Sequence, residues 1–450
     1  MADERRPESG ATIVLVVGTR PEAIKMLPLI IAFRADERFR AVVISTGQHS
    51  KMVADVFAMA NIVPDVTLYA TTPGMSLNAL FASVMTGVQR FIQGAFGEPR
   101  GAELGVAPSG YPTAMFVHGD TSSAAASAVA AFHMRIPVVH VEAGLRTSDI
   151  LSPYPEEFNR QVISRIAALH LAPTAQNAAN LEHEGIDRGR IFICGNTAID
   201  ALKLAAQVHP DFADPRLQKL HEDHSTRVVL VTTHRRENWG AGIRRIATAV
   251  EQLSDAYPDV HFVVSVHPNP EVGAILTEVL DGRDNVILTA PLPYGQFAHL
   301  IDRSYFAISD SGGIQEEAPA LGTPVLVARE ETERQEGVAA GTVELVGTQV
   351  ERIVDAASRL LDSPDLRNER AGRLNPYGDG ESAERIVAAA AHVAFGSPAP
   401  APFGPPFDRH KVLVAGGYSV DPASLLAFMA DLTTPAEERI DSSRMVSDLQ

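Results

Sequence analysis

The chain is poor in several features that would narrow its class at once, beginning with cysteine and long apolar stretches. Its 450 residues include a single cysteine, Cys194, which excludes an internal disulfide framework and a cysteine metal cluster. No apolar stretch approaches the roughly 20 residues that a membrane helix needs. We therefore expect no membrane association and a reducing, cytoplasmic setting, with Cys194 as a small core residue.

Basic residues are scarce relative to acidic ones. The chain has 38 Lys and Arg against 55 Asp and Glu, a formal net charge of −17. Because nucleic-acid phosphates attract basic surfaces, this balance argues against nucleic-acid binding. An anionic small molecule would need basic residues gathered locally against the overall sign.

Patterns of common cofactor sites are also missing. The sequence has no P-loop, and no Gly-x-Gly-x-x-Gly opens its first helix. Its histidines lack the His-Glu-x-x-His spacing of a zinc site. We expect neither a cofactor nor a metal.

Short apolar runs alternate with helical segments along most of the chain. In the first half, β-branched runs predict buried strands at 12–17, 41–45, 114–117 and 137–141, with helices at 22–35 and 121–133. After about residue 200 the alternation restarts, with runs at 227–231, 261–264, 286–288, 306–309 and 324–327. This rhythm predicts an α/β protein with two doubly wound, Rossmann-like domains and a cleft between them.

The same reading gives domain boundaries. We expect a disordered lead at 1–10 without a secretory signal, an N-terminal domain at 11–198, a C-terminal domain at 199–378, a helix at 379–396 packing back on the N-terminal domain, and a Pro-rich spacer with a C-terminal extension at 397–450. The extension carries one strand-like run, 411–414. It either docks on a dimer or is disordered, and we favour disorder.

A nucleotide-binding segment is predicted at Asp310–Glu317, directly after the strand at 306–309. Gly312 and Gly313 open a helix whose unpaired N–H groups suit a diphosphate, and Glu317 lies one turn further on, within reach of a ribose diol. The alternative is an ordinary strand-to-helix turn. His234 and Arg334 follow other strands of this domain and are further candidates for contact with phosphate, although a charged surface loop also explains His234.

Acidic and basic groups follow three strands of the N-terminal half. Arg20 and Lys25 come after the first strand, where they would lie near the crevice. Asp120 and Glu142 follow two later strands, and Glu156 opens a helix. Helix capping near Asp120 and the helix dipole at Glu156 are simpler explanations. Taken together, however, carboxylates in one site shift each other's pKa and can serve as acid and base.

These segments together resemble the non-hydrolysing UDP-N-acetylglucosamine 2-epimerase family. The resemblance extends from about residue 12 to 395, in order and with family-like spacing. The matching segments are Gly18–Met26, Thr46–His49, His118–Thr121, His140–Thr147, Pro155–Arg160, Thr233–Asn238, His267–Pro270, Asp310–Glu317 and Thr332–Arg334.

The resemblance implies a fold of the glycosyltransferase-B type, UDP in the cleft and a homodimer. By position it implies catalytic roles for Asp120, Glu142, Glu156 and His234. It implies substrate contacts for Arg20, Lys25, Phe297, Ser311, Gly312, Gly313, Glu317 and Arg334, with Phe297 near the uracil. It makes Gln48, His49, Arg235 and His267 candidate regulatory positions. The implied reaction expels UDP from UDP-N-acetylglucosamine, leaves a bound 2-acetamidoglucal, and returns UDP to give UDP-N-acetylmannosamine.

Two features depart from the family. Members activated by their own substrate tend to carry Gln at the position of Lys51 and Arg near Met85, so this form of regulation is in doubt here. The extension after residue 397 lies outside the family core. A glycosyltransferase, a hydrolysing epimerase and a non-catalytic nucleotide-sugar sensor remain alternative functions on the same fold.

Overall fold

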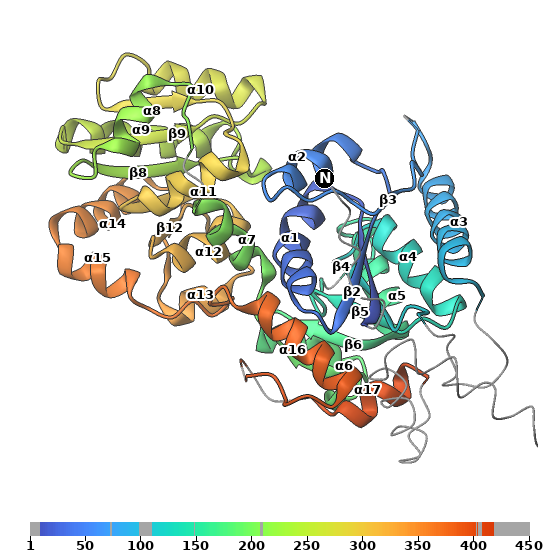
Figure 1. Cartoon of the computed structure of the whole chain (residues 1–450). Helices are drawn as coiled ribbons and strands as arrows, with labels where there is room; N and C mark the ends of the chain where they lie inside the picture. Colours follow the sequence, from blue (N-terminus) through green and yellow to red (C-terminus); the bar gives the residue numbers. More distant parts are fainter. Residues whose placement is uncertain are drawn as a thin grey trace, which may run out of the picture. The chain divides into compact units, whose positions relative to one another are not determined.

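The computed structural model describes residues 10–72, 74–98, 110–147, 149–207, 210–401, 403 and 407–417. The chain divides into two compact units (Figure 1). Unit 1 comprises the described residues up to Thr197 together with those from Glu381 onward, and unit 2 comprises Ala198–Gly380. Of the lead predicted at 1–10, residues 1–9 lie outside the described residues.

Unit 1 is built on a seven-stranded parallel sheet of order β3-β2-β1-β4-β5-β6-β7. Its strands are β1 (Ala11–Val17), β2 (Phe39–Ser45), β3 (Val66–Thr67), β4 (Ala114–His118), β5 (Val138–Val141), β6 (Ala167–Ala172) and β7 (Ile191–Ile193). Its helices are α1 (Arg20–Ala35), α2 (Ser50–Ala58), α3 (Leu77–Phe96), α4 (Ser122–His133), α5 (Glu156–Ile166), α6 (Ala175–His183), η1 (Arg188–Arg190), α16 (Ser382–Phe395) and α17 (Arg409–Ala415).

Both faces of this sheet are buried, which explains why its strands read as continuous apolar runs. Val14 and Val16 pack with α3 and α4 on one face. The neighbouring Ile13 points to the other face, where it meets residues of α16 and α17. The register fits this alternation, since Ile13 pairs with Ala41 on one side and Ala114 on the other. Cys194 is 1% exposed, so its predicted core position is confirmed.

Unit 2 repeats the plan with a six-stranded parallel sheet of order β10-β9-β8-β11-β12-β13. Its strands are β8 (Arg227–Thr232), β9 (Val260–Ser265), β10 (Val286–Thr289), β11 (Phe306–Ser309), β12 (Val325–Val327) and β13 (Val343–Leu345). Its helices are α7 (Thr197–Ala206), α8 (Pro215–Glu222), η2 (Arg236–Asn238), α9 (Ala241–Ala256), α10 (Pro270–Leu280), α11 (Tyr294–Arg303), α12 (Gly312–Glu317), η3 (Ala318–Leu321), α13 (Gln335–Ala340), α14 (Val350–Asp362) and α15 (Pro364–Ala371).

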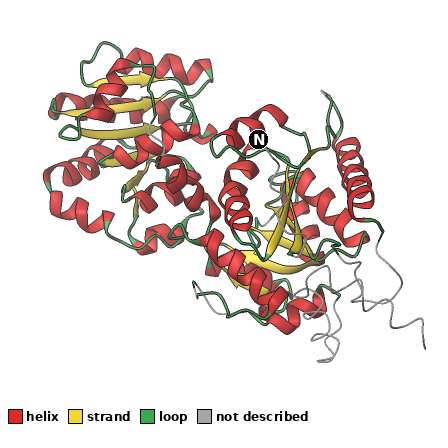
Figure 2. Cartoon of the chain, viewed as in Figure 1, coloured by secondary structure: helices red, strands yellow, loops and turns green. Residues whose placement is uncertain are grey.

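Helices cover both faces of each sheet, as Figure 2 shows with helices in red and strands in yellow. In unit 2, Val229 and Val231 pack against α9 and α14, while Val228 and Leu230 pack in the cluster on the opposite face. The predicted α/β class with two doubly wound parallel sheets is therefore confirmed. Within the described residues, no helix is long and apolar enough to cross a membrane.

The C-terminal extension differs from the prediction. The prediction of a strand at 411–414 is wrong, because these residues lie in the helix α17 (Arg409–Ala415). Asp408 caps this helix by accepting hydrogen bonds from the backbone N–H groups of His410 and Lys411. The expected disorder is wrong for this part of the extension, since α17 packs on β6 and η1 of its own unit. Residues 418–450 lie outside the described range.

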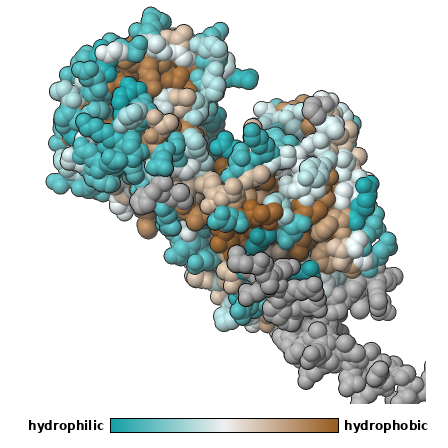
Figure 3. Space-filling model, turned by 45° about the horizontal axis from the view of Figure 1, so that its top comes forward, coloured by the Kyte–Doolittle hydropathy of each residue, from teal (hydrophilic) through white to brown (hydrophobic). Residues whose placement is uncertain are grey.

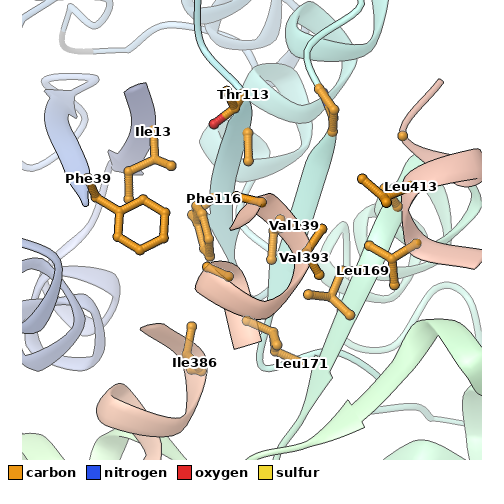
Figure 4. A pocket seen from close by; sticks show the side chains of 17 residues that line it. Ile13, Phe39, Thr113, Phe116, Val139, Leu169, Leu171, Ile386, Val393 and Leu413 are labelled. Carbon is orange, nitrogen blue, oxygen red and sulfur yellow. The ribbon is translucent and has the colours of Figure 1, made fainter. Parts of the chain in front are cut away.

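The added helix α17 lies beside α16 on unit 1 (Figure 1). The two helices and the sheet surround an apolar cavity of about 60 Å³ (Figure 4). Ile13, Ala114 and Ala168, which line it, stand near the amino ends of their strands. This cavity is therefore at the edge of the sheet opposite to the one where site residues were predicted.

Apolar side chains also reach the surface, where Figure 3 shows them in brown among teal hydrophilic residues. In unit 1 several of them belong to the segment between β5 and α5. Leu151 is 67% exposed and Tyr154 is 65% exposed. This segment leads directly into Glu156, so the predicted carboxylate lies beside exposed apolar side chains.

Candidate active site

The strand order reverses at one point in each sheet, between β1 and β4 in unit 1 and between β8 and β11 in unit 2. At such a point the loops that follow the two strands diverge and leave a crevice at the carboxyl edge of the sheet, where ligands bind. Most of the predicted site residues follow these four strands or their neighbours. Each crevice is described in turn.

A buried carboxylate ties the two loops at the crevice of unit 1 together. Glu22 is 3% exposed and accepts hydrogen bonds from the backbone N–H groups of Gly18 (2.9 Å) and Thr19 (2.6 Å). Its other oxygen accepts from the hydroxyl of Thr121 at 2.7 Å, across to the loop after β4. These bonds place the exposed Arg20 at the start of α1. Lys25 follows one turn later.

Glu142 lies between a lysine and a histidine. Lys25 Nζ donates a hydrogen bond to Glu142 Oε1, and His118 Nε2 lies 3.4 Å from Oε2. Burial disfavours the charged form of Glu142, but the positive charge and the hydrogen bond of Lys25 are the main causes that outweigh it and lower the pKa to about 2. The carboxylate is therefore ionised at neutral pH and can act as a base.

The backbone of Glu142 is unusual. Its φ of +59° lies in the left-handed region, which non-glycine residues rarely adopt and which costs of order 1 kcal/mol. Such conformations persist where the surrounding structure enforces them, and they cluster at functional sites.

Asp120 is held by a helix that is distant in sequence. Its Oδ2 accepts hydrogen bonds from Arg160 Nε at 2.9 Å and lies 2.7 Å from Arg160 Nη2. Asn159 donates to the backbone carbonyl of Asp120 at 2.8 Å. Burial raises the pKa of Asp120, Arg160 opposes this rise, and the nearby Glu142 adds to it. The pKa values of Asp120 and Glu142 are thus moved in opposite directions, as in paired acids and bases.

The helix cap that was considered as the simpler explanation for this loop is provided by a neighbouring residue. Thr121, not Asp120, is the N-cap of α4, and its hydroxyl accepts from the backbone N–H of Ala124 at 3.0 Å. The Asp120 side chain is left for Arg160.

Glu156 is the first residue of α5 and is half-buried. It lies one helical turn before Arg160, so both side chains extend from the same face of the helix. Within the described residues, its carboxylate has no hydrogen-bond or ion-pair partner. Arg160 itself is fixed by Glu157, whose Oε2 accepts from Arg160 Nη1 at 2.9 Å.

In unit 2 a buried aspartate joins the two strands at the switch point. Asp310 is fully buried and accepts hydrogen bonds from the backbone N–H groups of His234 (3.0 Å) and Arg235 (3.1 Å) and from the amide of Asn238 (2.9 Å). Burial opposes its ionisation, but these bonds together lower the pKa of Asp310. The ring of His234 lies with Nδ1 3.3 Å from Asp310 Oδ1, and its side chain is 42% exposed.

Two guanidinium groups approach the first turn of α12. A Cβ atom at Gly312 would lie 3.1 Å from Arg334 Cζ and 3.3 Å from Arg235 Nη2, so a glycine allows this close approach. Arg334 is oriented by Glu316, whose Oε1 accepts from Arg334 Nε at 2.9 Å. The predicted helical run from Ile314 to Leu321 is divided between α12 and η3 and ends at Gly322.

The remaining predicted residues are placed as follows. Ser311 is the N-cap of α12, and a Cβ at the exposed Gly313 would lie 3.6 Å from Glu317 Oε1. Phe297 lies in α11 and packs against the core of unit 2. The rings of His234 and His267 stack with centroids 6.4 Å apart. Gln48 accepts a hydrogen bond from Ser123 at 2.7 Å, and His49 is exposed at the start of α2.

Unit 1 thus brings together Lys25, Asp120 and Glu142, and unit 2 brings together His234, Arg235, Gly312 and Arg334. Sequence reasoning assigned no individual role to Glu22, Arg160 or Asp310, although each binds a predicted residue or the loop that carries one. For Arg160 a signal existed, since it stands four residues after Glu156 on the same predicted helix. Among the described residues, no cluster of three or more His, Cys, Asp or Glu side chains could hold a metal ion.

Comparison with known proteins agrees with this arrangement. The sequence model of the family described as UDP-N-acetylglucosamine 2-epimerase matches residues 31–391. This chain belongs to that family. It is an isomerase of the epimerase type, as the sequence motifs predicted. The added helix α17 lies beyond the matched range.

Individual relatives show how much of the chain is shared. The UDP-N-acetylglucosamine 2-epimerase of Yersinia pestis is 41% identical over 381 residues, 84% of this chain and 97% of that protein. The crystal structure of UDP-GlcNAc 2-epimerase from Neisseria meningitidis bound to UDP-GlcNAc matches with a TM-score of 0.68 and 37% identity, over 84% of this chain and 99% of that one. The co-structure of S. aureus MnaA with UDP matches with a TM-score of 0.71 and 36% identity, over 88% and 100%. The predicted glycosyltransferase-B type of fold is confirmed.

Proposed function

We propose that this protein interconverts UDP-N-acetylglucosamine and UDP-N-acetylmannosamine by eliminating UDP and adding it back. The observation that carries the proposal is the pair Asp120 and Glu142, whose pKa values shift in opposite directions at one crevice. Inverting C2 needs a proton removed from one face of the sugar and returned to the other, which calls for more than one acid or base. Support also comes from the relatives whose structures contain UDP-GlcNAc or UDP.

In the proposed elimination, a carboxylate of unit 1 takes the proton from C2. The C2–H electron pair forms the C1=C2 double bond, and the C1–O bond breaks with its electrons going to the β-phosphate oxygen of UDP. The products are 2-acetamidoglucal and UDP, and both stay bound. A proton then returns to the opposite face of C2 while the UDP oxygen attacks C1. We propose that Asp120, Glu142 and Glu156 carry these protons.

The leaving group needs positive charge and N–H donors where its negative charge develops. We propose that unit 2 supplies them through Arg334, His234 and the first turn of α12 at Gly312 and Gly313, with Ser311. Glu317 would bind the ribose and Phe297 would lie against the uracil. Arg20 and Lys25 would contact the substrate from unit 1. The functional form would be a homodimer.

Incubation with UDP-N-acetylglucosamine in heavy water tests the proposal. We expect deuterium at C2 of both recovered epimers. Absence of C2 exchange with an active, folded preparation would reject it. Release of free N-acetylmannosamine with UDP would identify a hydrolysing epimerase, and transfer to an added acceptor without exchange would identify a glycosyltransferase.

A further inference from the structure

His118, the last residue of β4, is a buried histidine with no role so far. It is 3% exposed, and within the described residues its Nε2 makes no hydrogen bond. A buried polar atom without a partner is destabilising, and an aliphatic side chain would avoid this penalty. Packing alone therefore does not explain an imidazole at this position.

The unpaired nitrogen of His118 faces the carboxylate of Glu142, with 3.4 Å between Nε2 and Oε2. Lys25 holds the other oxygen, Oε1. Burial lowers the pKa of His118 to about 4, so the ring is neutral at neutral pH and carries one N–H; the facing carboxylate favours the tautomer with this proton on Nε2. On this side of Glu142, the ring of His118 is the group placed to orient Oε2.

The surroundings of the pair are charged on several sides. Lys25 comes from α1, Arg160 from α5 and Asp120 from the loop after β4. The buried His140 of β5 lies 2.7 Å from the carbonyl oxygen of Gly119 through its Nε2, which fixes the backbone directly after His118. The carboxylate lies close to this backbone, since a Cβ at Gly119 would be in ordinary contact with Glu142 Oε2 at 3.6 Å, and the φ of +64° favours glycine here.

We propose that His118 is a positioning residue, whose N–H directed at Oε2 fixes the carboxylate of Glu142 for proton transfer at C2 of the substrate. This inference rests on the proposed function, in which Glu142 carries a proton. His118 acts through Glu142 and does not itself touch the substrate. A carboxylate that is hydrogen-bonded through one oxygen and faced by an N–H at 3.4 Å on the other is restricted in orientation, and a small displacement of such a group slows the reaction much more than it weakens binding.

Three substitutions separate this role from a merely structural one. His118→Leu fills the space without an N–H. His118→Gln keeps an N–H donor at a similar reach, whereas His118→Asn is polar but too short. The matched control is His170→Leu on β6, which removes another fully buried imidazole whose ring nitrogens have no hydrogen-bond partner within the described residues.

The experiment measures kcat, KM and the isotope effect on kcat with substrate deuterated at C2. For His118→Leu we expect kcat to fall about 10- to 100-fold with KM within about twofold, together with a larger isotope effect, because proton transfer becomes slower than the other steps. His118→Gln should recover most of the lost kcat. The control His170→Leu should behave as the wild type.

The inference is overturned if His118→Leu keeps the wild-type kcat and isotope effect, or if the control loses as much activity. If the leucine variant does not fold, the Gln and Asn variants decide, and equal kcat values for the two contradict the proposal. Failure of the proposed function looks different, since the wild type itself would then show no exchange at C2.

Discussion

The two units have the same strand order around the point where it reverses, but different side chains follow the strands there. In unit 1 the residues after β1, β4 and β5 form two groups: Glu142 contacts Lys25 and His118, and Asp120 contacts Arg160 of α5. In unit 2 the loops after β8, β11 and β12 hold one carboxylate that accepts backbone N–H groups, with two guanidinium groups beside a glycine. The fold provides a crevice at the carboxyl edge of each sheet, and the residues that follow the strands determine the chemistry that each crevice can support.

The role of the buried carboxylate illustrates the difference. Asp310 of unit 2 accepts three short hydrogen bonds from its own unit, which uses most of its acceptor capacity and leaves it to hold a loop. Glu142 of unit 1 is paired with side chains instead, and these can adjust to a change in its charge, as the proposed proton transfer requires. We therefore expect substitutions in unit 1 to change turnover and substitutions in unit 2 to change UDP binding.

The largest effect is expected for Asp120→Asn. The amide cannot exchange a proton, so turnover should fall about 100-fold or more, in the range of general acid–base contributions. The dissociation constant of UDP should change only modestly, because Asp120 lies in unit 1. Steady-state kinetics and calorimetric titration with UDP measure the two quantities. Unchanged turnover would reject Asp120 as catalytic.

A smaller effect, on stability, is expected for Leu413→Ala in the added helix α17. Leu413 is 3% exposed and packs over the sheet of unit 1, so its truncation should cost about 2 kcal/mol. That is the low end for a buried leucine, because the side chain already borders a cavity. Urea unfolding measures the loss. The activity per folded molecule should stay unchanged, and lower activity would connect α17 to the site.

Next comes Arg334→Gln in unit 2. Loss of a charged hydrogen bond to a phosphate should weaken UDP binding about 10-fold, equivalent to about 1.4 kcal/mol. Arg352→Gln, an exposed arginine of the same unit, is the matched control and should bind UDP like the wild type. Equal binding by both variants would remove Arg334 from the proposed UDP site and weaken the contrast between the units.

The smallest effect is expected for Lys411→Ala. Lys411 forms an exposed ion pair with Asp187 at 2.9 Å, and such pairs contribute little because water and salt screen them. The urea midpoint should not change measurably. A clear loss would mean that charge, rather than the burial of residues such as Leu413, attaches α17 to unit 1.

Much of the fold could be predicted because parallel strands that are buried on both faces consist of continuous apolar runs in the sequence. The same reasoning gave a wrong prediction for Lys411–Val414, where the β-branched residues suggest a strand. The segment pairs with no strand, and it forms a helix that Asp408 caps. The motifs identified Asp120 and Glu142. They did not show that Arg160, 40 residues away, binds Asp120, or that His118 faces Glu142, because those contacts exist only once β4, β5 and α5 are assembled.

Positional isotope exchange tests the central claim most directly, namely that UDP leaves the sugar while proton transfer occurs at C2 and then returns. UDP-N-acetylglucosamine labelled with oxygen-18 in the bond between C1 and the β-phosphate would be incubated with the enzyme and recovered. We predict that the label spreads to the non-bridging oxygens of the β-phosphate, because the freed phosphate can rotate before UDP adds back. Label that stays entirely in the bridging position, while the epimers interconvert, would contradict the account.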